Sequence, residues 1–182
     1  MKKTLLLILF LLIPTNIFAT NPVIKGLDPF EVVKDKLHQT ATWHKMPAIV
    51  VCTHAPVEKE KVQKSIKFWK KLGYRFHSSV YFKESRSAEA CMSDNPVGYI
   101  VIDLVTQKTF GNYDDMAITH FYIDNRTREI HWARIYLKTN VEERVLEHEL
   151  GHALGWMHST TTGHLMHKKW VHGGWKIDGL KK

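Results

Sequence analysis

One stretch near the end of the chain decides how the rest is interpreted: residues 148–166 read HELGHALGWMHSTTTGHLM. Its first five residues place two histidines and a glutamate in the pattern H-E-x-x-H. On a helix, His148 and His152 lie about 6 Å apart along the axis and only about 40° apart around it, so both imidazoles can reach one ion. Glu149 lies about 100° round from His148 and can flank that ion without being forced to bind it. The stretch therefore predicts a metal-binding helix.

A third ligand requires the chain to turn back toward this helix. A straight helix would carry the side chain of His158 away from the first two histidines, but Gly155 can adopt a positive φ and end the helix. Three neutral imidazoles suit Zn²⁺ and leave a fourth position open for water, which is the catalytic rather than the structural arrangement. The pattern thus predicts one catalytic zinc ion held by His148, His152 and His158. Glu149 is the predicted catalytic residue beside it.

The N-terminus has the composition of a secretory signal. Lys2 and Lys3 precede a short apolar run at residues 5–13, and Ala19 ends a plausible cleavage site. The run is too short to cross a bilayer comfortably, for which about 20 residues are needed, although an uncleaved anchor is the alternative. We expect residues 1–19 to be a signal peptide and the protein to be secreted or periplasmic, without stable membrane insertion after cleavage.

The charge balance is basic. Removal of the signal would take away two lysines and reduce the formal net charge from +8 to +6. A basic balance suits an acidic substrate or an anionic surface. The alternative, which we favour from sequence alone, is a solvated helix face together with a solubilising tail; no nucleic-acid partner is expected. The lysines concerned are Lys59, Lys61, Lys64, Lys67, Lys70 and Lys71, and then Lys168, Lys169, Lys176, Lys181 and Lys182.

The chain has two cysteines, Cys52 and Cys91. In an exported protein such a pair predicts one disulfide bond, with two buried free thiols as the alternative. On the chain-entropy model, closing a loop of that length would add roughly 4 kcal/mol of stability. Neither cysteine lies near the histidines in sequence, so we expect no catalytic role for them.

The remaining sequence predicts one α/β domain built on a mixed sheet, at residues 43–182, after a leader at 20–42. The leader contains a short helix that begins after Asp28. A second helix is expected over 57–72, where apolar side chains recur at helical spacing, and Asn140 with Glu143 is expected to cap the metal-binding helix. Strands are expected at 43–53, 74–82, 99–105, 116–123 and 129–137, with the apolar run 99–105 in the centre and a hairpin turn at 124–127.

With the metal-binding helix placed, the chain resembles the metzincin zinc metallopeptidases, and among these the matrixin group. The resemblance covers roughly residues 43–166 in element order, but its specific motifs lie between His148 and Met166. Ser159, directly after the third histidine, and its spacing to Met166 are both of the matrixin type. The resemblance implies an α+β, metzincin-like zincin domain: a mixed twisted sheet, an active-site helix, and a Met-turn whose Met166 forms a hydrophobic floor beneath the metal.

The resemblance also implies an activity. It predicts an exported zinc endopeptidase, a monomer, that hydrolyses peptide bonds by metal-activated water with Glu149 as general base. A protein or peptide substrate would bind in extended form along an edge strand, here about residues 116–121. The rival interpretation is an exported, metal-stabilised binding module on a peptidase scaffold. Glu149 counts against that rival, because a binding module has no need of this carboxylate.

The sequence departs from the matrixin pattern in several places. Lys168 replaces the usual proline two places after the methionine, no cysteine-switch motif precedes the domain, and the loop before Met116 lacks the H-x-D motif. We therefore expect no zinc-bound cysteine and no second zinc. The tail after Met166 is short and rich in Gly and Trp, so we expect the usual C-terminal helix to be shortened or missing. Ca²⁺ could bind at Asp103, Asp114, Asp115 or Asp124, but ordinary turn carboxylates are favoured. Exposed loop positions are expected for His164, His167 and His172.

Overall fold

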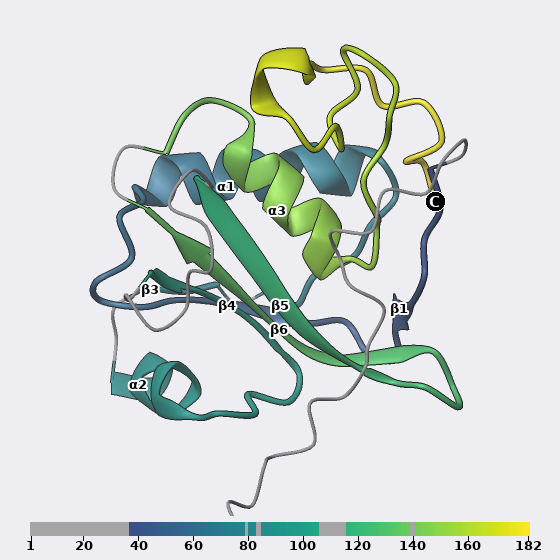
Figure 1. Ribbon diagram of the computed structural model, residues 1–182. Helices are drawn as coiled ribbons and strands as arrows, with labels where there is room; N and C mark the ends of the chain where they lie inside the picture. The colour runs from purple at the N-terminus through teal and green to yellow at the C-terminus, as the bar shows by residue number, and fades with distance from the viewer. Residues whose placement is uncertain (1–36, 79, 83–84, 106–115, 139–140) are drawn as a thin grey trace, which may run out of the picture.

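The computed structural model describes residues 37–78, 80–82, 85–105, 116–138 and 141–182. A twisted six-stranded sheet has helices α1 (Lys59–Lys71) and α3 (Val145–Ala153) on one face and the short helix α2 (Ser85–Met92) on the other, as Figure 1 shows. The architecture is mixed α/β, as predicted. The predicted signal peptide and the helix after Asp28 lie outside the described residues.

The sheet is mostly parallel. Its strands are β1 (Thr42–Trp43), β2 (Ala48–Val51), β3 (Val80–Phe82), β4 (Tyr99–Leu104), β5 (Ala117–Asp124) and β6 (Glu129–Leu137). The parallel order is β3-β2-β4-β6, and β1 pairs in parallel with the first two residues of β6. β5 pairs with β6 in the antiparallel direction and has no other strand neighbour among the described residues, so it forms an edge. The predicted hairpin between these two strands is confirmed.

Strand β4 is central and covered on both faces, as its continuous apolar sequence predicts. Ile100 and Ile102 belong to the large core shared with α1 and α3, whereas Val101 belongs to a small cluster under α2. Successive side chains of a strand point to opposite faces, so this division follows directly from the pleat. All three side chains are fully buried.

Helix α1 confirms the predicted helical spacing. Val62, Ile66 and Trp69 are buried, and the chain leaves the helix through Gly73, whose φ is +96°. Trp69 packs edge-on against the ring of Tyr74 at 5.2 Å between centroids. This helix therefore builds the core against which α3 lies.

Three predicted boundaries were wrong. The expected strand at 74–82 contains only β3, because Tyr74 turns inward and its hydroxyl accepts a 2.6 Å hydrogen bond from Trp156 Nε1 rather than joining the sheet. The expected strand at 43–53 divides into β1 and β2. Helix α3 begins at Val145 instead of following Asn140, since Arg144 precedes it with φ 72° and no side chain caps its first turn. Asn140 itself lies outside the described residues.

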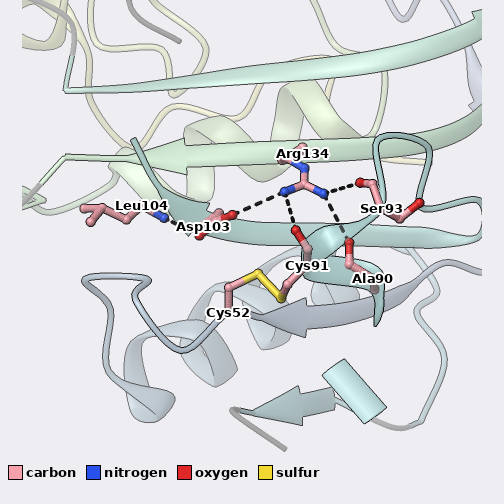
Figure 2. Close-up of a disulfide and its surroundings, with 7 residues drawn as sticks. All are labelled: Cys52, Ala90, Cys91, Ser93, Asp103, Leu104 and Arg134. Carbon is pink, nitrogen blue, oxygen red and sulfur yellow. Dashed lines mark hydrogen bonds and ion pairs between the residues drawn. A yellow bond between two sulfur atoms is a disulfide. The ribbon is translucent and has the colours of Figure 1, made fainter. Parts of the chain in front are cut away.

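A disulfide bond between Cys52 and Cys91 joins the end of β2 to α2, as predicted. Figure 2 shows the guanidinium of Arg134 beside it, bonded to the carbonyls of Ala90, Cys91 and Ser93 and to the carboxylate of Asp103. The described residues of α2 thus attach to the sheet covalently and through one arginine. A disulfide is typical of an oxidising, extracellular environment. Within the described part of the chain, no helix is both long enough and apolar enough to cross a membrane.

Candidate metal centre

Helix α3 presents the first two histidines because its opposite side is anchored in the core. Leu150 is fully buried there. Trp69 donates its Nε1–H to the Glu147 carbonyl at 2.9 Å, and the Ser65 hydroxyl donates to the Glu147 carboxylate at 2.8 Å. These contacts with α1 fix the rotation of α3 about its own axis, and with it the directions of the two histidines.

The helix ends in a glycine turn, as the sequence predicts. Gly155 has φ +91°, and its N–H donates to the His152 carbonyl at 2.8 Å. The Trp156 N–H donates to the Gly151 carbonyl at 3.0 Å. These two bonds form a Schellman motif, which satisfies the last carbonyls of the helix. A Cβ at position 155 would collide with the Ala41 carbonyl oxygen, so glycine also allows a close approach of the chain before β1.

The last residues of the predicted leader hold this turn in place. Thr40 donates its N–H to the Gly155 carbonyl at 2.9 Å, and Met157 donates its N–H to the His38 carbonyl at 3.2 Å. The loop that leads to the third histidine is therefore bonded on one side to α3 and on the other to residues 37–42. The described residues of the predicted leader therefore pack against the domain.

The three predicted histidine ligands converge. His152 Nε2 lies 2.9 Å from His148 Nε2 and 3.1 Å from His158 Nε2. One potential ligand atom from each ring lies within 4.8 Å of the other two. Among the described residues, these histidines are the group of His, Cys, Asp and Glu side chains that could hold a metal ion.

Backbone carbonyls set the tautomers of two of these rings. His148 donates its Nδ1–H to the Leu165 carbonyl at 2.8 Å, and His152 donates its Nδ1–H to the Trp156 carbonyl at 2.7 Å. A carbonyl can only accept, so the proton of each neutral ring lies on Nδ1 and the Nε2 atom carries a bare lone pair. The two facing lone pairs repel unless a cation lies between them. The donors present therefore fit a metal ion, and their outer hydrogen bonds are those typical of histidine ligands.

Burial keeps these rings uncharged. Desolvation lowers the pKa of His148 to about 4. Desolvation also lowers the pKa of His152 well below its ordinary value, and the neighbouring rings of His148 and His158 lower it further. Because a metal ion binds the neutral imidazole, the site requires no deprotonation of these two rings near pH 7.

Glu149 is buried and is oriented by the edge strand. The Thr119 hydroxyl of β5 lies 2.5 Å from Glu149 Oε2 and 3.2 Å from the Glu149 carbonyl. A hydroxyl has one proton, so the shorter contact is the donated one and it fixes one oxygen of the carboxylate. Sequence reasoning missed Thr119. The alternation of β5, which places Ala117 and Thr119 on the same buried face, is the signal that could have found it.

Met166 packs directly under the helix that carries the first two ligands. It is fully buried, and a Cβ added at Gly151 would collide with the Met166 sulfur. Ser159 donates its N–H to the Met166 carbonyl at 2.8 Å, which closes the loop between the third histidine and the methionine. The predicted floor residue therefore contacts α3 between His148 and His152.

The prediction for His164 was wrong. Its side chain is buried rather than exposed: Nδ1 accepts the Met166 N–H at 3.0 Å, and Nε2–H donates to the Asp178 carbonyl at 3.0 Å. These bonds tie the Met166 turn to the tail, so His164 has a structural role. His167 is half-buried and His172 is exposed.

The carboxylates considered for Ca²⁺ have other partners where they are described. Asp103 pairs with Arg134 at 3.2 Å. Asp124 accepts the N–H groups of Arg126 and Thr127 in the hairpin turn, and these bonds lower the pKa of its carboxyl. Asp114 and Asp115 lie outside the described residues.

A pocket of about 380 Å³ opens directly onto the histidines and Glu149. Three segments form its walls: the start of β5, the start of α3, and the chain after Met166. The residues that line it, besides the metal-centre residues His148, Glu149 and His158, are Met116, Ala117, Arg144, Val145, Leu165, His167, Lys168, Lys169, Trp170, Val171 and Gly173. A molecule in this pocket would therefore contact the metal centre, the edge strand and the tail together.

Comparison with known proteins gives no family assignment. No protein-family model, no curated protein and no solved structure matches this chain. Any functional conclusion therefore rests on the residues of the metal centre and the pocket beside it.

Proposed function

We propose that this chain is an exported zinc-dependent endopeptidase with a metzincin-like, matrixin-type active site. The observation that carries the proposal is the convergence of the Nε2 atoms of His148, His152 and His158 at a pocket that also contains Glu149. The donor set supports zinc, since three neutral imidazoles are a common ligand set for catalytic zinc. The buried carboxylate beside the ligands supports hydrolysis rather than metal storage or binding alone.

The edge strand supports a peptide as substrate. β5 begins beside the pocket, and β6 is its one strand neighbour among the described residues, so its other side could pair with a chain in extended conformation. Main-chain hydrogen bonds along such an edge hold a peptide without regard to its sequence, and neighbouring pockets then select side chains. A scissile bond lying across the pocket would be held close to Glu149 and the histidines.

The chemistry divides between the ion and the protein. When bound, zinc would act as a Lewis acid that lowers the pKa of water toward about 7 and polarises the scissile carbonyl. Glu149 accepts the proton of the attacking water and returns it to the leaving amine. Thr119 holds Glu149 Oε2 and so keeps the carboxylate directed toward the reaction. The carbonyls that accept from the Nδ1–H groups of His148 and His152 hold the proton of each neutral ring on Nδ1, so that the Nε2 lone pair can bind the ion.

The first experiment is metal analysis of the purified full chain together with cleavage of casein before and after chelation. We expect stoichiometric zinc and cleavage that stops on chelation and returns when zinc is restored. Tightly held zinc without cleavage of any unstructured protein would favour the binding-module alternative. A preparation that binds no zinc would exclude both.

The Glu149→Gln variant separates metal binding from catalysis. We expect it to retain zinc and to lose turnover by about 10²–10⁴-fold, the usual contribution of a general base. Glu142→Gln, at an exposed position just before α3, is the matched control and should cleave at the wild-type rate. Wild-type turnover by Glu149→Gln would remove Glu149 from the mechanism.

A further inference from the structure

The pocket beside the metal centre is basic. Among the residues that line it, Arg144, Lys168 and Lys169 are cationic, and Glu149 at the metal centre is the carboxylate. Within the described residues, none of these three cations forms an ion pair with an Asp or Glu side chain. Within the described part of the pocket, their positive charges therefore have no carboxylate partner and outnumber the negative charge of Glu149.

Arg144 is held in a defined position at the pocket wall. Its guanidinium carbon lies 5.0 Å from the centroid of the Trp170 ring. Trp170 is itself fixed, because its Nε1–H donates to the Glu143 carbonyl at 3.1 Å. A Cβ on Gly173 would lie 3.1 Å from Arg144 Nη1, so the guanidinium also lies close to that backbone. A guanidinium stacked in this way loses little freedom when it binds a carboxylate through two parallel hydrogen bonds.

The wall that carries the two lysines is hydrogen-bonded to the loop around Gly163 and within its own turn. Gly163 donates its N–H to the His172 carbonyl at 2.7 Å, and Lys176 donates its N–H to the Gly163 carbonyl at 2.9 Å. Gly173 donates its N–H to the Lys169 carbonyl at 3.1 Å, which closes the turn around the short 3₁₀-helix Trp170–His172. Lys168 and Lys169 therefore lie on an ordered rim of the pocket.

We propose that this pocket selects an acidic side chain, Asp or Glu, on the substrate residue that flanks the scissile bond. The inference rests on the proposed endopeptidase function, since it concerns the substrate of the same site. The Arg144 guanidinium binds the carboxylate, the two lysines at the rim attract it, and Trp170 and Val171 contact its methylene groups. The basic tail, which the sequence alone favoured as a solubilising segment, thereby acquires a role in specificity.

The test uses the zinc-loaded full chain and three quenched-fluorescence peptides that differ at a single position beside the cleavable bond: Glu, Gln or Lys. Hydrogen bonds to charged groups are the strong ones, so kcat/KM for the Glu peptide should exceed that for the Gln peptide by about tenfold or more. The Lys peptide should be the poorest. Added salt should reduce the preference, because part of it is attraction at an exposed rim.

Two variants assign the preference to this pocket. Arg144→Gln should reduce the ratio of kcat/KM for the Glu peptide to that for the Gln peptide at least about fivefold. Lys168→Glu/Lys169→Glu, at exposed positions, should reduce or reverse the ratio and provides a test if Arg144→Gln fails to fold. Lys64→Glu/Lys67→Glu makes the same change in net charge on the exposed side of α1, outside the pocket, and should keep the wild-type ratio.

Binding to the inactive Glu149→Gln variant, measured by calorimetry, separates the two proposals. Tighter binding of the Glu peptide, lost in Glu149→Gln/Arg144→Gln, supports the pocket assignment even if turnover is low. Cleavage of all three peptides at equal rates overturns the acidic preference and leaves the endopeptidase proposal intact. If no peptide is cleaved and binding does not discriminate between them, both the endopeptidase proposal and the acidic preference are overturned. If Lys64→Glu/Lys67→Glu loses the preference to the same extent as the pocket variants, the preference arises from overall charge and the pocket assignment is overturned.

Discussion

At the scale of single residues, the hydrogen bond between Thr119 and Glu149 joins the edge strand to the proposed general base. Thr119→Val keeps the size and β-branching of the side chain but removes the donor to Glu149 Oε2. We expect kcat to fall roughly tenfold or more with zinc retained, as found for other partners that orient residues of metal sites. The acid limb of the pH profile of kcat/KM should also move, because the carboxylate loses a bond to its charged form.

Thr119→Ser is the matched control, since it restores the hydroxyl and should recover most of the activity. A Thr119→Val enzyme with wild-type kcat and an unchanged pH profile would show that the threonine acts only in packing.

Gly155 is constrained in two ways, by its positive φ and by the neighbouring Ala41 carbonyl. The left-handed conformation costs a non-glycine residue roughly 1–2 kcal/mol. Gly155→Ala should therefore lower the free energy of unfolding by more than this amount. Gly98→Ala is the control: Gly98 has φ +85° but nothing within 4 Å of an added Cβ. Urea unfolding of both variants measures the difference. Equal losses would mean that the contact with Ala41 contributes nothing.

Local spacing made the ligands predictable. His148, His152 and the turn at Gly155 depend on helix geometry alone, so the sequence was sufficient to place them. Thr119 was not predictable in this way, because its contact with Glu149 joins segments that meet only when β5 lies against α3. His164 was misplaced for a similar reason, since burial by the tail around Asp178 is a property of the folded loop.

At the scale of elements, the disulfide and the metal centre lie on opposite faces of the sheet. Cys52 and Cys91 attach α2 to β2, whereas the histidines extend from α3 and the chain that follows it. Cys52→Ala/Cys91→Ala should therefore destabilise the fold by up to about 4 kcal/mol, from the separation of 39 residues on the chain-entropy model. Zinc affinity of the folded fraction should be unchanged.

Unfolding in denaturant measures the first effect and zinc titration measures the second. Reduced zinc affinity in the folded double variant would mean that the two faces of the sheet are coupled.

The sequence predicted well those elements whose apolar side chains pack against the core along the whole length of the helix or strand. The apolar run of β4 and the spacing of α1 both survive in the structure, because each element packs along its full length. Tyr74 and Phe76 alternate as in a strand, yet they are buried outside any strand in the described residues. Burial alone produced that alternation, and tertiary packing around Trp156 determined the backbone.

At the scale of the whole molecule, the metal centre should control the response to acid. In the metal-free protein, burial lowers the pKa of His148 to about 4, against an ordinary value of 6.5, so the folded chain binds fewer protons than the unfolded chain. The contribution of neutral, buried His148 to the free energy of unfolding is fully present above about pH 6.5 and is lost as the pH falls toward 4. For His148 alone the shift corresponds to about 3 kcal/mol, and the lowered pKa of His152 acts in the same direction.

Chelated protein should therefore lose unfolding free energy steeply between pH 6.5 and 4, as measured by urea denaturation at a series of pH values. Zinc-loaded protein should keep its stability further into that range, because an ion that binds only the folded state stabilises it until protons displace it from the imidazoles. His148→Gln removes one of the titrating groups and should flatten the slope of the chelated protein, whereas His54→Gln, at an exposed position outside the metal centre, should not. Equal slopes for the chelated wild type and His148→Gln would mean that the acid sensitivity originates away from the metal centre.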